Sequence, residues 1–324
     1  MHQIVVGVLR GGPSGEHEVS LKSGHAILSH LPSERFIPRD IYIDKKGVWH
    51  DRGLPTTPGR ILPTIDVAIV AVHGAYGHDG EAQKVLERFG VPYVGPDPHH
   101  SFRASHKALA KEVAREAGIP TARYFFAEDT EKAEQAARDA VRTFLQPVVV
   151  KPVDSGSSLG VTFARGFKEV SEAMQELFSG GARGVLIEER LRGAEATVGV
   201  VEGLRGEELY TLPTIEIIPP EGHGFFCNDA KYDDATQEVC PGRFAPDVSD
   251  TLKGYASTMH KLLGQRHYSR SDFIITKRGV YFLETNPAAA VGMTDSSLMP
   301  KALASVGVKL EEFLEHVIDL AHKR

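Results

Sequence analysis

The feature that most constrains the fold is an apolar run near the N-terminus that stops at two adjacent glycines. Residues 3–12 read QIVVGVLRGG, and residues 18–31 have the apolar spacing of a helix. Two more strand-like runs follow at 39–44 and 66–74, and a second helical segment occupies 80–90. Strands that alternate with helices are typical of an α/β domain with a parallel sheet, in which ligands gather beyond the C-terminal strand ends.

The rest of the chain alternates less regularly. We expect a helix from about residue 103, a strand at 147–152, a helix at 167–178 and a strand at 184–191. Residues 269–286 indicate two strands joined by a tight turn. A C-terminal amphipathic helix carries on one face Leu310, Phe313, Leu314 and Val317. At 324 residues the chain exceeds the ~250–300 residues at which single cores stop growing, so two or three domains are expected.

Charge and composition exclude several classes of partner. The net charge of −6 gives no electrostatic basis for binding nucleic acid or an anionic membrane. The apolar run at 4–9 lacks the basic flank of a signal peptide, and no run approaches the ~20 residues of a membrane-spanning helix. Cys227 and Cys240 lack CxxC spacing, so we interpret them as reduced thiols. We expect a cytoplasmic protein with neither nucleic-acid nor membrane partners.

The segment KPVDSGSSLG, residues 151–160, has the composition of a phosphate-binding loop. Lys151 ends a predicted strand, and the glycines and serines that follow let backbone N–H groups approach an anion. The segment matches neither GxxxxGK[ST] nor GxGxxG. A Gly/Ser-rich turn without a ligand is the alternative interpretation.

A second candidate site lies in the predicted strand pair at 269–286. Arg270 and Asp272 are two positions apart on one strand, and Glu284 and Asn286 are two apart on the next, so each pair shares a face. Carboxylate and carboxamide oxygens beside an arginine fit a site for Mg²⁺ and a polyphosphate. A salt bridge between the strands, or a strand that ends in a polar turn, are the alternatives.

These segments resemble, in order and over nearly the whole chain, the D-alanine–D-alanine ligases of the ATP-grasp superfamily. The matching segments are GGPSGEHEVSLKSG (11–24), HGAYGHDGEAQKVLERFGVPYVGP (73–96), SHKALAK (105–111), KPVDSGSSLGV (151–161), IEERLRGAEAT (187–197), AKYDDATQEVCP (230–241), SRSDF (269–273) and ETN…GMTDSSLMP (284–300). Eight segments in register make the resemblance highly specific to the family and less specific to the exact substrate.

The resemblance implies a fold, a reaction and cofactors. It implies an α/β fold, α+β in its later parts, with three domains: a first-substrate domain at 1–102, a central ATP-grasp domain at 103–183 and a C-terminal ATP-grasp domain at 184–324. ATP would phosphorylate the carboxylate of one D-alanine, and the amine of a second would attack the acylphosphate, as in peptidoglycan precursor synthesis. Two Mg²⁺ ions, with Mn²⁺ as an alternative, and a homodimer are also implied.

For the nucleotide, the resemblance matches Lys107 and Lys151 to lysines that hold the phosphates, and Glu188 and Glu195 to carboxylates near adenine and ribose. Lys231 matches the lysine of the ω-loop that reaches the γ-phosphate. The implied nucleotide-binding set is Lys107, Lys151, Ser157, Glu188, Glu189, Glu195 and Lys231. The implied metal ligands are Asp272, Glu284 and Asn286.

For the amino acids, Glu16 matches a glutamate that orients the first substrate's ammonium group, with His73 close by; a capped strand-end histidine is the alternative for His73. Ser158 and Tyr232 match a hydrogen-bonded unit that closes the site. Tyrosine at this position favours an amine over D-lactate as the second substrate. The implied catalytic set is Glu16, Ser158, Tyr232, Arg270 and Gly292. The implied substrate-binding set is Glu16, His73, Arg270, Gly292, Ser297 and Leu298.

Two of these residues belong to a loop that departs from the family's pattern. The resemblance matches Gly292, with Arg270, to groups that stabilise the tetrahedral intermediate, and Ser297 to a group that holds the second substrate's carboxylate. The family usually reads N-T-x-P-G-[MF]-T here, whereas five residues, 287–291, separate Asn286 from Gly292. The loop is two residues longer, and it borders the implied acceptor site.

Two histidines also depart from the pattern. His78 stands where the family commonly has glutamate, and His106 where an acidic residue often precedes the lysine. An ATP-grasp ligase with another second substrate, a D-amino acid or a D-hydroxy acid, would vary at the acceptor loop. A nucleotide-binding protein with impaired turnover is a further alternative, although the implied metal ligands and Lys231 are all present.

Overall fold

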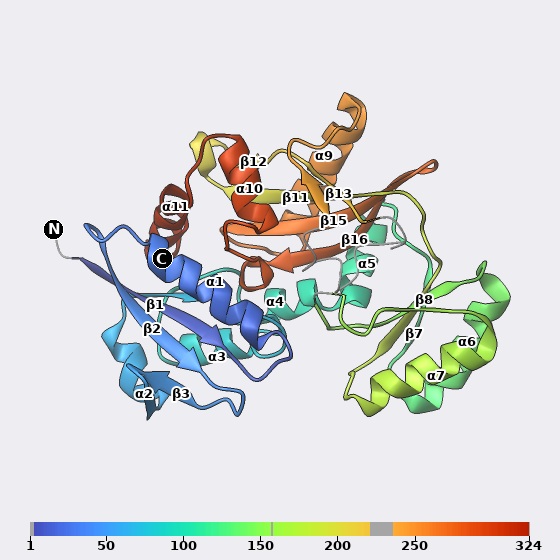
Figure 1. Cartoon of the computed structure of the whole chain (residues 1–324), viewed down its shortest axis with the longest axis horizontal. Coiled ribbons are helices and arrows are strands. Elements are labelled where there is room, and N and C mark those ends of the chain that lie inside the picture. The colour runs from blue at the N-terminus through green and yellow to red at the C-terminus, as the bar shows by residue number, and fades with distance from the viewer. Residues whose placement is uncertain (1–2, 157, 221–235, 324) are drawn as a thin grey trace.

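A computed structural model describes residues 3–156, 158–220 and 236–323, which form three sheets (Figure 1). The sheet nearest the N-terminus lies on one side of the molecule, the second lies on the opposite side, and the third lies between and above them in this view. Within the described residues no helix is both long and apolar enough to cross a membrane.

The first sheet has the strand order β4-β3-β2-β1-β5-β6. Its parallel strands are β1 (Ile4–Gly11), β2 (Phe36–Ile43), β5 (Val67–Val70) and β6 (Tyr93–Val94). An antiparallel edge is formed by β3 (Trp49–Asp51) and β4 (Leu54–Thr56). The helices of this part are α1 (His17–His30), α2 (Pro58–Ile61) and α3 (Glu81–Arg88), with a 3-10 turn at Leu62–Thr64. The predicted parallel sheet is confirmed, although β5 ends at Val70, four residues before the predicted end.

The turn after β1 depends on its glycines. Gly11 and Gly12 both have positive φ angles, of 92° and 96°, which side chains rarely adopt. A Cβ on Gly11 would lie 2.2 Å from the carbonyl oxygen of Ile43 on the neighbouring strand. The chain can therefore leave the sheet sharply and begin α1 within the next few residues, which places Glu16 at the N-terminal end of that helix.

The second sheet is antiparallel and has the order β7-β10-β8-β9. Its strands are β7 (Tyr124–Ala127), β8 (Val148–Pro152), β9 (Thr162–Ala164) and β10 (Val185–Glu188). Two helices, α6 (Thr130–Thr143) and α7 (Gly166–Ser179), lie together on one face, and buried Ala137, Val170 and Met174 fill the space beneath them. The predicted helix at 167–178 is confirmed, whereas α6 is an element that the sequence analysis did not identify.

The third sheet follows the order β14-β13-β11-β15-β16, with β12 paired to β11. The strands are β11 (Ala194–Glu202), β12 (Leu209–Thr211), β13 (Ile215–Ile218), β14 (Gln237–Val239), β15 (Tyr268–Thr276) and β16 (Gly279–Pro287). The helices of this part are α9 (Pro246–Leu262), α10 (Leu298–Ser305) and α11 (Leu310–His322), with 3-10 turns at Leu204–Gly206 and Ala288–Ala290. Thr276 pairs with Gly279, which confirms the predicted tight turn between β15 and β16.

The C-terminal helix α11 packs against the first sheet, which is formed by the N-terminal part of the chain. All four residues predicted to share its apolar face are buried: Leu310, Phe313, Leu314 and Val317. They belong to the same core cluster as Val6 and Val8 of β1. Figure 1 shows α11 beside α1 and the first sheet. The last helix therefore packs on the N-terminal sheet, and the domain boundaries at 102 and 183 stay a prediction.

Two short helices connect the first sheet to the others. The sequence predicts one helix from about residue 103, but the structure has α4 (Pro98–Ser105) and α5 (Lys107–Glu116). His106 separates them with a ψ angle of 98°, and its side chain caps α5 by accepting a hydrogen bond from the Leu109 amide. This break turns α5 toward the third sheet and places Lys107 at its first position.

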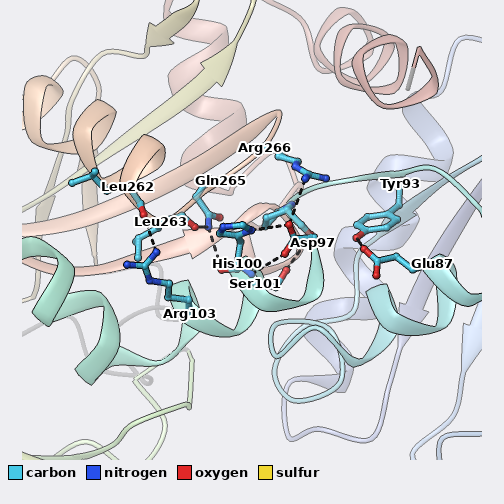
Figure 2. A network of polar contacts seen from close by, with 11 residues as sticks. Glu87, Tyr93, Asp97, His100, Ser101, Arg103, Leu262, Leu263, Gln265 and Arg266 are labelled. Carbon is cyan, nitrogen blue, oxygen red and sulfur yellow. Dashed lines mark hydrogen bonds and ion pairs between the residues drawn. The ribbon is translucent and has the colours of Figure 1, made fainter.

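A polar network fixes α4 against the segment between α9 and β15 (Figure 2). The carboxylate of Asp97 caps α4 through the His100 amide at 3.0 Å and pairs with the His100 ring at 2.7 Å. Arg266 reaches the same carboxylate at 3.4 Å. Arg103 donates to the carbonyl of Leu262 at 3.2 Å. These contacts hold α4, which follows the first sheet, against the segment that leads into β15 of the third sheet.

Candidate active site

Two adjoining pockets lie among the three sheets. The first, of about 360 Å³, is bounded by the second and third sheets, and its lining includes Lys107, Lys151, Glu188, Glu195 and Asp272. The second, of about 590 Å³, is bounded by α1, the loop after β5 and the loop after β16, and its lining includes Glu16, His73, Asn286, Gly292 and Ser297. The residues that line both pockets are Arg270, Glu284 and Leu298. The structure thus brings most of the predicted site residues into one continuous region.

Lysines from two elements enter the first pocket. Lys107, at the start of α5, places its ammonium 3.2 Å from Glu284 Oε2 and donates to the backbone carbonyl of Ser155. Lys151, near the end of β8, lies 2.9 Å from Glu188 Oε1. The phosphate-loop interpretation of residues 151–160 is compatible with this placement, because Ser155, Ser158 and Leu159 line the same pocket.

Glu188 is deeply buried between two lysines. Its Oε1 atom lies 2.9 Å from Lys151 Nζ and 3.2 Å from Lys111 Nζ. Burial alone would raise the pKa of Glu188, but the two ammonium groups outweigh it and hold the pKa below its ordinary value. Lys111 is fully buried as well, and the sequence analysis assigned it no role. Its position four residues after Lys107 on a helix, where residues share a face, was the available signal.

The β15–β16 pair aligns four polar residues on one face. Asp272 is opposite Glu284, and Arg270 is opposite Asn286. Arg270 donates two hydrogen bonds of 3.0 Å to Asp272, and Asn286 donates one of 2.9 Å to the same carboxylate. A register shift follows Asp272, so the facing pair sits at a local irregularity of the ladder. The predicted cluster is present, and the Arg270–Asp272 ion pair lies within one strand.

The donor set of this cluster fits a divalent cation. Asp272, Glu284 and Asn286 supply carboxylate and carboxamide oxygens on one face of adjacent strands, which suits the hard oxygen ligation of Mg²⁺. The neighbouring cations Arg270 and Lys107 pair with these carboxylates and can turn to phosphate oxygens. Among the described residues no group of three or more His, Cys, Asp and Glu side chains is arranged as a complete metal site. A cation bound by the two carboxylates would therefore need further oxygen ligands from a bound phosphate.

The second pocket has buried polar walls. Glu16 is 5% exposed, and a Cβ added to Gly156 would lie 3.0 Å from its Oε2 atom. The phosphate-loop segment therefore touches the carboxylate that is expected to hold an ammonium group. His73 lies in the same wall and contacts Ser23 Oγ at 3.1 Å. Burial, reinforced by His78, lowers the pKa of His73 to about 3, so its ring is neutral at pH 7.

The far wall of the second pocket is the loop after β16. Ser297 immediately precedes α10, and its hydroxyl lies 2.8 Å from Thr294 Oγ1 and accepts from the Thr294 amide at 3.2 Å. A Cβ on Gly292 would lie 2.8 Å from Ser297 Oγ, so only glycine fits there without displacing the serine. Leu298 begins α10 and lines both pockets. The predicted acceptor residues are therefore adjacent.

The longer loop is ordered by burial of its alanines. Residues 288–290 form a 3-10 turn, and Ala288 and Ala289 are each 3% exposed. Ala289 belongs to the core of the first sheet, and the carbonyl of Ala288 accepts from Tyr268 OH at 3.2 Å. His78 accepts from the Gly74 amide at 3.0 Å and also hydrogen-bonds the backbone of Ala289. Two of the three departures from the family's pattern, the longer loop and His78, thus contact each other.

The remaining predicted residues line the first pocket, pair with an arginine or lie outside the described residues. Ser158 lies at the pocket with a φ angle of 57°, which is unusual for a residue with a side chain. Glu195 lines the first pocket from β11. Glu189 accepts hydrogen bonds from the Arg123 amide at 3.1 Å and its guanidinium at 3.2 Å, so its carboxylate is held by an arginine. The predicted residues Ser157, Lys231 and Tyr232 lie outside the described residues.

Two family models match the chain. The one described as D-ala D-ala ligase N-terminus matches residues 5–59, and the one described as D-ala D-ala ligase C-terminus matches residues 113–319. The second match covers more than half of the sequence. The chain belongs to the D-alanine–D-alanine ligase family. Its three sheets and the pockets among them are the ATP-grasp fold of that family, as the sequence predicts.

Members of this ligase family match the chain over nearly its full length. The D-alanine–D-alanine ligase of Syntrophobacter fumaroxidans is 36% identical over 98% of both chains. Among solved structures, the VanG D-Ala:D-Ser ligase from Enterococcus faecalis has a TM-score of 0.86 and 25% identity over 99% of this chain and 100% of that one. The D-alanine–D-alanine ligase from Bacillus anthracis complexed with ATP has a TM-score of 0.79 and 25% identity over 99% and 98%.

Proposed function

We propose that the protein ligates two D-alanines to D-alanyl-D-alanine with hydrolysis of ATP to ADP and phosphate, as a step in peptidoglycan precursor synthesis. The observation that carries the proposal is the wall shared by the two pockets. Arg270 and Glu284 face a pocket that contains Lys107 and Lys151 on one side and a pocket with a buried carboxylate on the other. Chemistry between a nucleotide phosphate and an amino acid requires such a common boundary.

In the first step, the carboxylate of one D-alanine attacks the γ-phosphorus of ATP, and the bond to ADP breaks. Glu16 binds the ammonium group of this substrate, and the neutral ring of His73 adds no opposing charge. Lys107 and Lys151 bind phosphate oxygens and neutralise the negative charge of the phosphoryl group as it moves from ADP to the carboxylate. Asp272, Glu284 and Asn286 would hold Mg²⁺, which supplies Lewis-acid stabilisation of the phosphoryl group.

In the second step, the neutral amine of the second D-alanine attacks the acyl carbon, the bond from that carbon to the phosphate oxygen breaks, and the departing phosphate takes up the proton that the nitrogen loses. Arg270 is largely but not fully buried, and the carboxylates of Asp272 and Glu284 overcome the effect of burial so that its pKa stays above the ordinary value. A permanently charged guanidinium between the pockets stabilises the oxyanion. The Gly292 amide is the second oxyanion donor, and Ser297 holds the carboxylate of the incoming substrate.

A second candidate differs only in the acceptor. The longer 287–291 loop borders the second-substrate wall, and a solved structure with a TM-score of 0.86 is a D-Ala:D-Ser ligase. A D-serine hydroxyl, another D-amino acid or a D-hydroxy acid would meet that wall. The higher identity to a D-alanine–D-alanine ligase, 36% against 25% for the D-Ala:D-Ser ligase, favours D-alanine as the acceptor.

The test is phosphate release by the purified protein with Mg²⁺–ATP and one of five additions: D-alanine, L-alanine, D-alanine with D-serine, D-alanine with D-lactate, or none. The product of each reaction is identified by mass spectrometry. Release that depends on D-alanine and yields its dipeptide supports the proposal. A mixed product formed in preference to the dipeptide supports the second candidate, and nucleotide binding without any product contradicts both. We propose a cytoplasmic homodimer, and sedimentation of the same sample tests whether the protein is a dimer.

A further inference from the structure

Lys111 is a charged side chain with no exposed surface and no assigned role. It lies on α5, one helical turn after Lys107, and its relative exposure is 0%. Its ammonium lies 3.2 Å from Glu188 Oε1 and 2.9 Å from Thr121 Oγ1. A buried ammonium is strongly unfavourable unless it is paired, so the pairing with Glu188 accounts for its burial. Burial lowers the pKa of Lys111 to about 8, and the group therefore remains charged at pH 7.

The charges around Glu188 do not cancel. One carboxylate oxygen serves both Lys111 and Lys151, at 3.2 Å and 2.9 Å. The three groups together carry one net positive charge. Lys151 lines the first pocket, whereas Lys111 does not, so the surplus charge is presented to the pocket by Lys151 alone. Without Lys111 the remaining Lys151–Glu188 pair would be neutral.

We propose that Lys111 is a positioning residue for polyphosphate binding, because it neutralises Glu188 from behind and leaves the charge of Lys151 available to the nucleotide phosphates. The proposal rests on the proposed function only in taking the first pocket as the ATP site. Opposite charges a few ångströms apart interact strongly in a buried site, so the second lysine changes how firmly Lys151 is held by the carboxylate.

A second contact connects Lys111 to the metal-ligand strand. Thr121 Oγ1 accepts from Lys111 and donates to the carbonyl of Phe282 at 2.9 Å. Phe282 lies on β16, two residues before Glu284. Lys111 therefore contacts the second sheet through Glu188 and the third sheet through Thr121.

The test compares Lys111→Met with Lys111→Arg in the full-length protein. Affinity is measured by calorimetry for three probes: Mg²⁺–ATP, Mg²⁺–tripolyphosphate and adenosine. We expect Lys111→Met to weaken ATP and tripolyphosphate binding by on the order of tenfold, with adenosine binding unchanged and with Lys111→Arg close to the wild type. Lys132→Met is the matched control, because it removes a lysine of an exposed Glu128 pair on α6.

The double variant Lys111→Met/Glu188→Gln separates charge from packing. It removes the carboxylate together with the lysine, so Lys151 again carries a net charge, and we expect tripolyphosphate affinity to recover toward the wild type. Circular dichroism and thermal unfolding establish that each variant is folded; if Lys111→Met alone does not fold, the double variant and Lys111→Arg carry the comparison. Thr121→Val keeps the charges and should leave tripolyphosphate affinity within about twofold.

Several outcomes would overturn the proposal. Equal tripolyphosphate affinity in Lys111→Met and the wild type would do so, and so would a double variant that binds more weakly than a folded single variant. If Lys111→Met lost only adenosine binding and kept tripolyphosphate binding, Glu188 would instead be placed at the adenine ring. A wild type that binds tripolyphosphate but forms no D-alanine dipeptide contradicts the proposed function and leaves this comparison intact, because the binding readout needs no acceptor.

Discussion

Lys107 Nζ lies 3.2 Å from Glu284 Oε2, so the first residue of α5 contacts the end of β16 at the boundary of the two pockets. The lysine is 11% exposed and the carboxylate 24% exposed at the side chain, so both remain accessible to a ligand. Each group can exchange this contact for a phosphate oxygen or a cation without leaving the site. The ion pair holds two oppositely charged groups in place before substrates bind, which reduces the reorganisation that binding requires.

Replacing Glu284 tests the metal assignment. Glu284→Gln keeps the side-chain shape but removes the charge that a divalent cation requires, so we expect turnover to fall by on the order of 100-fold or more. Phosphate release is measured as a function of Mg²⁺ concentration. Glu172→Gln on α7, an exposed residue, is the control. Normal turnover at ordinary Mg²⁺ concentrations would remove Glu284 from the metal site.

Replacing Gly156 tests the first-substrate wall. A Cβ at this position would lie 3.0 Å from Glu16 Oε2, so Gly156→Ala should displace the carboxylate and raise the KM for D-alanine several-fold more than the KM for ATP. Steady-state kinetics with each substrate varied in turn give the two values. Gly254→Ala on α9 is the control, because a Cβ there has no neighbour within 4 Å. It should leave both KM values unchanged and stabilise the fold by about 0.5–1 kcal/mol.

The pair of buried histidines predicts sensitivity to acid. Burial lowers the pKa of His73 to about 3 and of His78 to about 4, from an ordinary value of 6.5. The unfolded chain therefore binds more protons between pH 6.5 and pH 4, and the free energy of unfolding should fall as the pH is lowered through this window. Urea unfolding at pH 7, 6, 5 and 4 measures the decline.

His78→Gln provides the comparison for that measurement. Glutamine can accept from the Gly74 amide and donate to the Ala289 backbone, as the neutral histidine does, but it does not titrate. Its stability should decline less steeply from pH 6.5 to pH 4. A slope equal to that of the wild type would mean that His78 contributes no proton-linked stability.

The buried alanines of the longer loop predict a packing effect. Ala289 is 3% exposed in the core of the first sheet, so Ala289→Leu should overpack that core and cost about 1–3 kcal/mol. Because the same loop leads to Gly292 and Ser297, the KM for the second substrate should rise while ATP affinity is retained. Ala304→Leu, at an exposed position of α10, is the control for the added side chain. Unchanged stability and kinetics in Ala289→Leu would argue that the loop is not anchored by its alanines.

Local periodicity was sufficient to predict that the β15–β16 pair carries polar residues on one face, because alternate residues of a strand share a face. The pairing of Asp272 with Glu284 depends also on the register shift after Asp272, because the register set by the two-residue turn alone would place Leu283 opposite Asp272. The apolar face of α11 was likewise predicted from periodicity, in this case the spacing of apolar residues along a helix. Its docking on the N-terminal sheet was not, because a helical pattern shows which face is buried but not against which element.

Other features depended on contacts that no local pattern records. Lys111 shares a helix face with buried Ala108 and Ala114, but only the approach of β10 supplies the carboxylate that pairs with its ammonium. The break at His106 has no proline or glycine to signal it. By contrast, α6 could have been predicted, since Asp129 caps an alanine-rich segment with helical spacing.

Because Arg270, Glu284 and Leu298 line both pockets, only a single layer of side chains lies between the two cavities at that point. A single molecule with a nucleotide-like half and a dipeptide-like half can therefore occupy both cavities through a short linker at Arg270. Its two halves would bind as one event, and the effective concentration of the second half would reach the millimolar range typical of short linkers. The wall that joins two substrates for reaction is also a place where one inhibitor can bind both sites.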